Sequence, residues 1–198
     1  PRPSLDKPMK DQIAKIVTES IKAKEALCAR EADAIAKAAR AMTDAFSCGN
    51  KLLICGNGGS AADSQHMAAE FVGRFRKERK ALPAIALTTN TSTLTAIAND
   101  YSYEATFSRE VEAHGKPGDI LLGISTSGSS KNVIAAAQKA RELGVTTIAL
   151  TGDRGGPLAG ACDIAIRACS NDTPRIQESH LLILHILCEL VENELCGR

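Results

Sequence analysis

The stretch from Gly56 to Glu70, GNGGSAADSQHMAAE, combines a glycine-rich turn with side chains that are able to do chemistry. Gly56, Gly58 and Gly59 can take backbone angles that other residues resist, so several N–H groups are able to converge on one anion. A helix that begins near Ser60 adds unsatisfied N–H groups and the positive end of its dipole. The pattern therefore predicts a phosphate site, and the alternative is a tight strand-to-helix turn without a ligand.

His66 and Glu70 lie four residues apart in the same stretch. Residues at this spacing share one face of a helix, so the imidazole and the carboxylate point the same way. The pair suits a metal ion or a proton-transfer step, and the alternative is an ordinary surface pair. The stretch also fits the GxGxxA form of the dinucleotide fingerprint. We discount NAD, because the next expected strand, 84–88, is not followed by the acidic residue that binds a ribose.

A polar stripe runs along an apolar segment near the C-terminus, RIQESHLLILHILCEL. Gln177 and His185 lie eight residues apart on one helix face, and an imidazole in such a segment needs a polar partner. One outcome is a histidine that finds its partner in the core. The other is that both residues meet His66 and Glu70, giving two imidazoles, a carboxylate and an amide, a set that suits zinc.

Hydroxyl side chains crowd a second turn, STSGSSKN, at residues 125–132. In open α/β sheets ligands bind beyond the carboxyl ends of the strands, where the strand order reverses. Side-chain hydroxyls and backbone N–H groups at the start of the following helix are suited to hold a phosphate there. A third loop, LTGDRGG at 150–156, also follows an expected strand, and TAIAND ends in Asn99 and Asp100, which cap a helix or contact the ligand.

Short apolar runs alternate with helical stretches after residue 50, which predicts a parallel sheet covered on both faces. Strands are expected at 51–55, 84–88, 120–124, 145–150 and 163–167, and helices at 61–75, 91–99, 104–114, 130–143, 156–160 and 174–195. Before them, residues 8–46 show helical periodicity and predict one long helix or two nearly continuous ones. Such a helix exceeds what one small sheet covers, so we expect residues 1–50 to be an oligomerisation segment, and the alternative is a coiled-coil hairpin within the chain.

Composition places the chain among ordinary globular proteins, with 198 residues, 44% of them hydrophobic, and a net charge of +1. A net charge this small gives no indication of binding to nucleic acid or to a membrane surface. No apolar run is long enough to span a bilayer. We interpret the basic run RFRKERK at 74–80 as a solvated helix end or loop. Seven cysteines without CxxC spacing and a start unlike a secretory signal predict reduced thiols and a cytoplasmic location.

Taken together, GNGGSAADSQHMAAE, TAIAND, STSGSSKN, LTGDRGG and RIQESHLLILH resemble the sugar isomerase (SIS) domain family. Within it the chain is similar to the sedoheptulose 7-phosphate isomerases, the phosphoheptose isomerases of bacterial heptose biosynthesis. The resemblance implies a three-layer, flavodoxin-like fold with a five-stranded parallel sheet, and an SIS domain at 51–198. It also implies a cytoplasmic homotetramer with active sites between subunits.

The resemblance further implies site residues. The family's zinc ligands, one ion per subunit, fall on His66, Glu70, Gln177 and His185. Its sugar-phosphate contacts fall on Asn57, Gly58, Gly59, Glu70, Asn99, Asp100, Ser125, Thr126, Ser127, Ser130 and Gln177. The family includes a non-catalytic branch that binds the bacterial replication initiator, in which the counterparts of Glu70 and His185 are replaced. Both residues are present here, which favours an enzyme.

The implied reaction moves a carbonyl between C2 and C1 of a seven-carbon sugar phosphate through an enediol. It needs a base for a weakly acidic C–H and a group that stabilises the developing oxyanion. Glu70 and His185 are the expected acid and base, and the residues alone do not assign the two roles. Two alternatives stay open, an isomerase of another sugar phosphate and a regulatory SIS protein that binds a partner without turnover.

Overall fold

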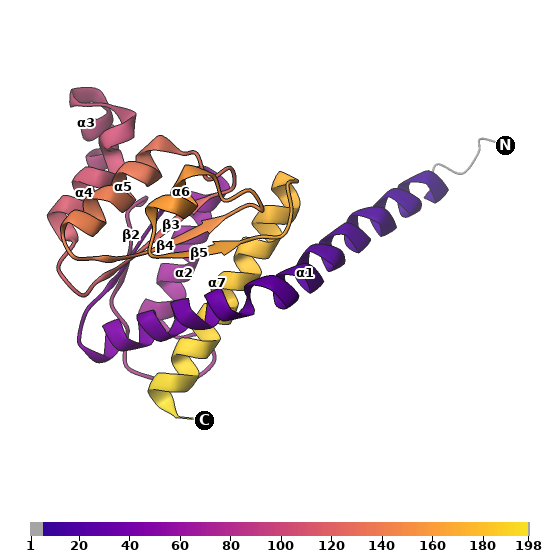
Figure 1. Ribbon diagram of the computed structural model, residues 1–198, viewed down its shortest axis with the longest axis horizontal. Coiled ribbons are helices and arrows are strands. Elements are labelled where there is room, and N and C mark those ends of the chain that lie inside the picture. The colour runs from indigo at the N-terminus through magenta and orange to yellow at the C-terminus, as the bar shows by residue number, and fades with distance from the viewer. Residues whose placement is uncertain (1–5, 198) are drawn as a thin grey trace.

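Five parallel strands form the centre of the computed structural model, which describes residues 6–197 (Figure 1). Their order in the sheet is β2-β1-β3-β4-β5, the flavodoxin-like order expected above. The strands are β1 (Leu52–Gly56), β2 (Ala84–Ala86), β3 (Ile120–Ser125), β4 (Thr146–Thr151) and β5 (Ile164–Arg167). Each lies within two residues of its predicted position. Residues 1–5 and 198 lie outside the described residues, so the predicted segment 1–50 is described from residue 6.

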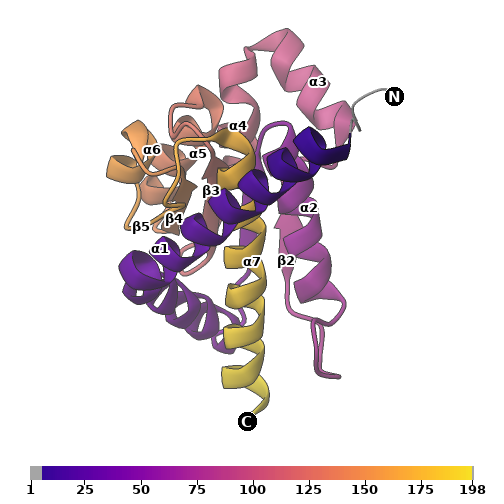
Figure 2. The same cartoon turned by 90° about the vertical axis from the view of Figure 1, so that its right-hand side faces the viewer.

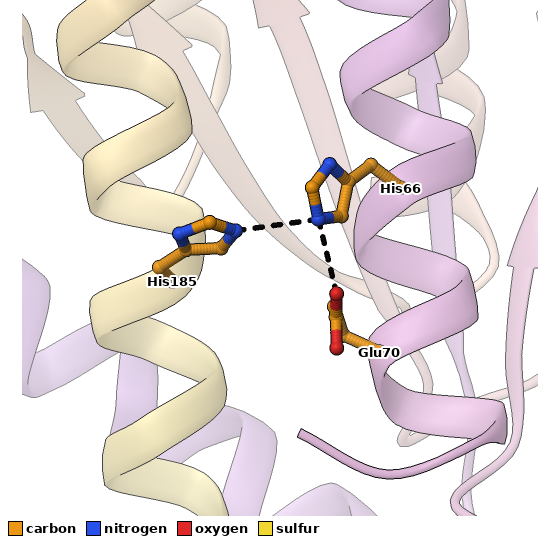
Figure 3. Close-up of side chains that lie close together, drawn as sticks. All are labelled: His66, Glu70 and His185. Carbon is orange, nitrogen blue, oxygen red and sulfur yellow. Dashed lines mark hydrogen bonds and ion pairs between the residues drawn. The ribbon is translucent and has the colours of Figure 1, made fainter. Parts of the chain in front are cut away.

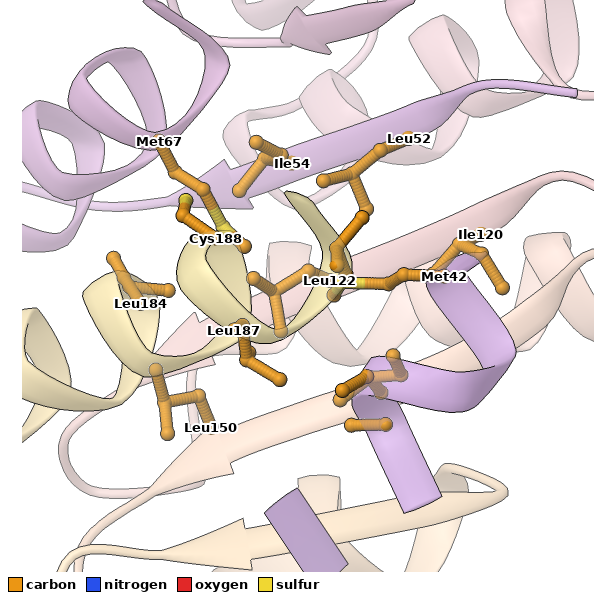
Figure 4. Close-up of a cluster of buried hydrophobic side chains, with 14 of the residues drawn as sticks. Met42, Leu52, Ile54, Met67, Ile120, Leu122, Leu150, Leu184, Leu187 and Cys188 are labelled. Carbon is orange, nitrogen blue, oxygen red and sulfur yellow. The ribbon is translucent and has the colours of Figure 1, made fainter. Parts of the chain in front are cut away.

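The apolar runs form strands because helices cover both faces of the sheet. Side chains alternate between the faces along each strand, so Leu52 and Ile54 enter one hydrophobic cluster while Leu53 and Cys55 enter another. Figure 4 shows the first cluster, in which α7 side chains pack onto the sheet. A strand that is buried on both sides reads as a continuous apolar run in the sequence.

Helices cover the sheet in two layers, which confirms the three-layer architecture. The first layer packs on the cluster that contains Leu52, and it consists of α1 (Asp6–Ser47), α2 (Gly59–Val72) and α7 (Thr173–Cys196). The second layer consists of α4 (Thr106–His114), α5 (Lys131–Glu142) and α6 (Gly156–Ala161). α3 (Thr91–Asp100) and a short 3-10 helix (Tyr103–Ala105) precede α4, so the helix predicted at 104–114 starts as a separate turn. α2 and α7 run side by side (Figure 2).

The N-terminal helix α1 is continuous over 42 residues, about 63 Å at the usual rise per residue. It ends before Gly49, whose φ of 79° suits a glycine. Its second half packs into the core through residues such as Leu27 and Met42. Its N-terminal turns extend away from the body of the molecule (Figure 1), whereas Ile16 and Ser20 still hydrogen-bond to α7. The first half exposes the apolar side chains of Met9, Ile13, Ile16, Val17 and Ile21. Among the described residues, no helix is long and apolar enough to cross a bilayer.

The interpretation of the basic run 74–80 as solvated is wrong for one residue. The Arg79 side chain is only 4% exposed and pairs with Glu192 of α7, whereas Arg74 and Arg76 are exposed. A buried cation requires a partner, and here the partner is distant in sequence.

Glu110 of α4 is 5% exposed, and its burial raises the pKa of the carboxyl to about 7. Between the ordinary pKa and 7, the folded chain keeps a proton that the unfolded chain releases, so stability falls as the pH rises through this window.

We expect Glu110→Gln to raise the free energy of unfolding by about 1–2 kcal/mol at pH 8, because the variant has no charge to bury, and much less at pH 4.5. Thermal unfolding at both pH values measures this. Glu112→Gln, at an exposed position of the same helix, is the control. An equal gain at both pH values would contradict the assignment.

Candidate functional site: a two-helix anion site and a histidine–carboxylate cluster

Two helices begin at the carboxyl ends of neighbouring strands, β1 and β3, where the strand order reverses. α2 follows β1, with Gly58 at its N-cap, and α5 follows β3, with Ser130 at its N-cap. Gly58 has no side chain with which to cap α2, and Ser130 makes no side-chain capping hydrogen bond to α5. The first N–H groups of each helix are therefore suited to bind an anion, which is the site that the glycine turn and the hydroxyl-rich turn predict.

Glycine is required in the turn that precedes α2. Gly58 has φ of +57°, which a side chain rarely tolerates. A Cβ at Gly56 would lie 2.7 Å from the Cβ of Ser60, and a Cβ at Gly59 would lie 2.7 Å from Nε2 of Gln177. The turn is tight because α2 starts directly against β1 and because α7 approaches it closely.

A hydrogen-bond network connects the two turns. Asn57 and Asn132 exchange two side-chain hydrogen bonds, each of 2.9 Å, and Tyr103 Oη donates to Asn57 Oδ1 at 2.8 Å. Asn132 is 3% exposed. Sequence reasoning missed both Asn132 and Tyr103, although Asn132 lies within the motif STSGSSKN. In the hydroxyl-rich turn itself, Ser125 and Ser130 share a hydrogen bond of 2.9 Å.

His66, Glu70 and His185 form a cluster between α2 and α7 (Figure 3). His66 Nε2 lies 3.0 Å from Glu70 Oε1 and 3.3 Å from His185 Nε2. The Phe75 ring packs beside His185, with ring centroids 5.4 Å apart. The His66 side chain is 43% exposed, so the cluster opens to the surface. Of the two outcomes that the polar stripe left open, the structure shows His185 beside the pair on α2.

The donor set of this cluster fits zinc. Its three ligating atoms all lie within 4.8 Å of one another. Two atoms that share a tetrahedral zinc at roughly 2.1 Å lie roughly 3.4 Å apart, close to the observed spacings. Two imidazole nitrogens that face each other at 3.3 Å also repel unless a proton or a cation lies between them.

Gln177 lies away from the other three expected ligands. It is about 12 Å from His185 along the axis of α7, at the usual helical rise, and its Nε2 packs against Gly59. The amide therefore lies at the start of α2, beside the anion site. Asn99 and Asp100 are exposed at the end of α3, where Asn99 Nδ2 donates to Asp100 Oδ1 at 2.9 Å. Within the described residues, their side chains have no hydrogen bond to the cluster or to the two turns.

The loop after β4 lies beside the hydroxyl-rich turn. Both face a cavity of about 270 Å³, whose lining includes Thr126, Ser127, Asp153 and Arg154. Behind it, His180 is fully buried, its ring bonds to the carbonyl of Thr151, and burial lowers its pKa to about 4. His180 is therefore a neutral core residue.

Comparison with known proteins gives consistent results. The SIS domain model matches residues 16–152. The chain is 53% identical over 191 residues to the phosphoheptose isomerase of Clostridium acetobutylicum, covering 96% of this chain and 97% of that one. It is 56% identical over 166 residues to the phosphoheptose isomerase of Rhodospirillum rubrum, covering 84% of this chain and 88% of that one.

Among solved structures, it is similar to the phosphoheptose isomerase of Neisseria gonorrhoeae, with a TM-score of 0.89 and 42% identity, covering 93% of this chain and 99% of that one. The Francisella tularensis phosphoheptose isomerase gives a TM-score of 0.90, 40% identity and coverage of 93% and 98%.

Proposed function

The chain belongs to the SIS domain family and, within it, to the phosphoheptose isomerases, and from this we propose its reaction and its site. The reaction is the conversion of D-sedoheptulose 7-phosphate to D-glycero-D-manno-heptose 7-phosphate in heptose biosynthesis. One observation carries the proposal above all: the cluster of His66, Glu70 and His185 shares helix α2 with the anion site. A phosphate seat and a proton-transfer centre are the two requirements of a sugar-phosphate isomerase.

The spacing between the two parts of the site supports a substrate with its phosphate far from its carbonyl. His66 lies seven residues beyond Gly59 on α2, about 10 Å along the helix axis. An extended seven-carbon sugar phosphate is of similar length, so its phosphate reaches the helix N-termini while C1 and C2 lie at the cluster. Gln177 lies against Gly59, at the phosphate end of this path.

The proposed substrate contacts follow from this placement and from the family. They comprise the turn after β1, the hydroxyl-rich turn, the end of α3, one residue of the cluster and the glutamine beside Gly59. These residues are Asn57, Gly58, Gly59, Glu70, Asn99, Asp100, Ser125, Thr126, Ser127, Ser130 and Gln177.

Proton transfer is assigned to Glu70 and His185. One takes the proton from C1 of the ketose while the other donates a proton to the carbonyl oxygen on C2, giving an enediol. The reverse transfers then return a proton to C2 and remove the proton of the C1 hydroxyl, which leaves the aldose. The open side of the cluster, where His66 is 43% exposed, leaves room for the sugar. Zinc is the proposed cofactor, one ion per subunit, held by His66, Glu70 and His185. Gln177, the fourth ligand that the family implies, lies beside Gly59 in this structure and would have to approach the cluster to join them. A bound zinc would polarise the carbonyl oxygen as a Lewis acid or stabilise the site.

We propose a cytoplasmic homotetramer with active sites between subunits. Residues 1–50 act as the oligomerisation segment and residues 51–198 as the SIS domain. The exposed apolar side chains on the first half of α1 support this, because an apolar face of that length favours a partner. The exposed position of Asn99 and Asp100 also suits contact with a site on a neighbouring subunit.

The test is incubation of the purified protein with sedoheptulose 7-phosphate in heavy water, followed by proton NMR. We expect an aldose with deuterium at the carbon next to the carbonyl, because the enediol takes its proton from a group that exchanges with solvent. A folded protein with added zinc that leaves the spectrum unchanged would contradict the proposal. Such a result would favour another sugar phosphate or a regulatory protein.

A further inference from the structure

Arg79 and Glu192 form a buried ion pair that joins the loop after α2 to α7. Arg79 Nε donates to Glu192 Oε1 at 3.0 Å, and the two side chains are 4% and 2% exposed. Neither residue is among the proposed ligands or substrate contacts. Because removing one partner leaves the other charge buried and unpaired, such a pair holds its two elements together strongly.

The rest of the Arg79 guanidinium binds the last turn of α2. Nη2 donates to the carbonyl of Glu70 at 2.8 Å, and Nη1 donates to the carbonyl of Phe71 at 2.8 Å. The last carbonyls of a helix have no partner within the helix, and helix ends fray. Glu70 lies in this turn, since α2 ends at Val72. Arg79 therefore fixes the backbone that carries the carboxylate of the cluster.

Glu192 binds the same loop and holds it against α7. Its carboxylate accepts N–H donors from Phe75 at 3.2 Å, Arg76 at 2.8 Å and Lys77 at 2.9 Å. Burial alone would raise the pKa of Glu192, but these N–H groups and the guanidinium outweigh burial and hold the pKa below its usual value. The charged carboxylate thus sets the position of Phe75, whose ring lies 5.4 Å from that of His185.

We propose that Arg79 and Glu192 are positioning residues for the reaction centre. One side of the pair fixes Glu70, and the other fixes the aromatic ring that supports His185. This inference rests on the proposed isomerase activity of the same cluster. The anion site lies at the opposite end of α2, so the pair is expected to affect the chemical step and metal binding more than phosphate binding.

The test compares Glu192→Gln with Glu189→Gln. Glu189 lies on the same helix and pairs with Arg76 of the same loop, but that ion pair is exposed. For Glu192→Gln, measured well below its melting temperature, we expect kcat to fall about 10- to 100-fold and zinc affinity to fall about 10-fold or more, with KM within about twofold. We expect Glu189→Gln to match the wild type in all three.

A second readout is independent of metal and turnover. Incorporation of 4-fluorophenylalanine labels the four phenylalanines of the chain, and Phe75→Leu assigns the signal of Phe75. We expect Glu192→Gln to move the Phe75 fluorine resonance towards its solvent-exposed value and Glu189→Gln to leave it in place. If the wild type does not isomerise the heptose, the proposed function fails, while the fluorine comparison still tests the pair.

A lower melting temperature for Glu192→Gln, with wild-type kcat, zinc affinity and fluorine shift in the folded protein, would overturn the inference. If Glu192→Gln does not fold, Arg79→Lys and Phe75→Leu take its place. Arg79→Lys keeps the positive charge. Its ammonium group lacks the planar set of N–H donors with which the guanidinium binds Glu192 and two carbonyls at once. Reduced kcat and zinc affinity in both variants would support positioning, and wild-type values in both would overturn it.

Discussion

Glu70→Gln is expected to lower kcat for sedoheptulose 7-phosphate by about 10³-fold or more, with the fold intact. The change removes the carboxylate charge but keeps the size of the side chain. Glu70 lies 3.0 Å from His66 and in the last turn of α2, where its backbone is held by Arg79. The amide retains a hydrogen-bonding oxygen for its neighbours but accepts a proton very poorly. The loss therefore falls on the proton-transfer step.

Steady-state rates and deuterium incorporation in heavy water test this expectation together. The exchange experiment detects the enediol even when net isomerisation is slow, so both signals should fall. Glu78→Gln is the matched control, because Glu78 lies in the adjacent loop with its side chain 90% exposed. We expect the control to show wild-type rates. Turnover close to wild type in Glu70→Gln would remove this residue from the mechanism.

The cluster on α2 and α7 was predictable from the sequence only in part. The pairing of His66 with Glu70 follows from helical spacing alone, since residues four apart share a face. Joining His185 to them required the fold, because 119 residues separate the two histidines. The polar stripe on an apolar helix supplied the signal, as an imidazole there needs a partner. The strands were predictable for a similar reason, because burial on both faces leaves a continuous apolar run.

The buried ion pair of Arg79 and Glu192 shows what the sequence does not reveal. Arg79 stands in a run of charged residues, and most members of such a run are solvated. Its partner lies 113 residues away, and no local pattern marks either residue as buried. The same holds for Asn132, whose link to Asn57 depends on β1 and β3 being neighbours. Pairings between distant polar residues are set by strand order and helix packing, and neither is readable from residue spacing.

His185→Ala is expected to lower kcat about 10²- to 10⁴-fold and to weaken zinc binding. The imidazole supplies a nitrogen 3.3 Å from His66 and packs on Phe75, so its loss removes a proton-transfer group and a ligand together. His114→Ala, at the exposed end of α4, is the control, and we expect it to match the wild type. Initial rates and zinc competition measure both effects.

The turnover of the double variant, His185→Ala with Glu70→Gln, shows whether the two residues act in one shared step or in independent steps. If the two residues serve one proton transfer, the double variant should be about as slow as the slower single variant, because residues that act as a unit are strongly non-additive. If they act independently, the two losses multiply. Near-wild-type turnover in His185→Ala would remove the imidazole from the reaction and leave Glu70 to transfer both protons. The fold permits such a route only if one carboxylate reaches C1 and C2 in turn, so this outcome would also place the sugar carbons directly above the last turn of α2.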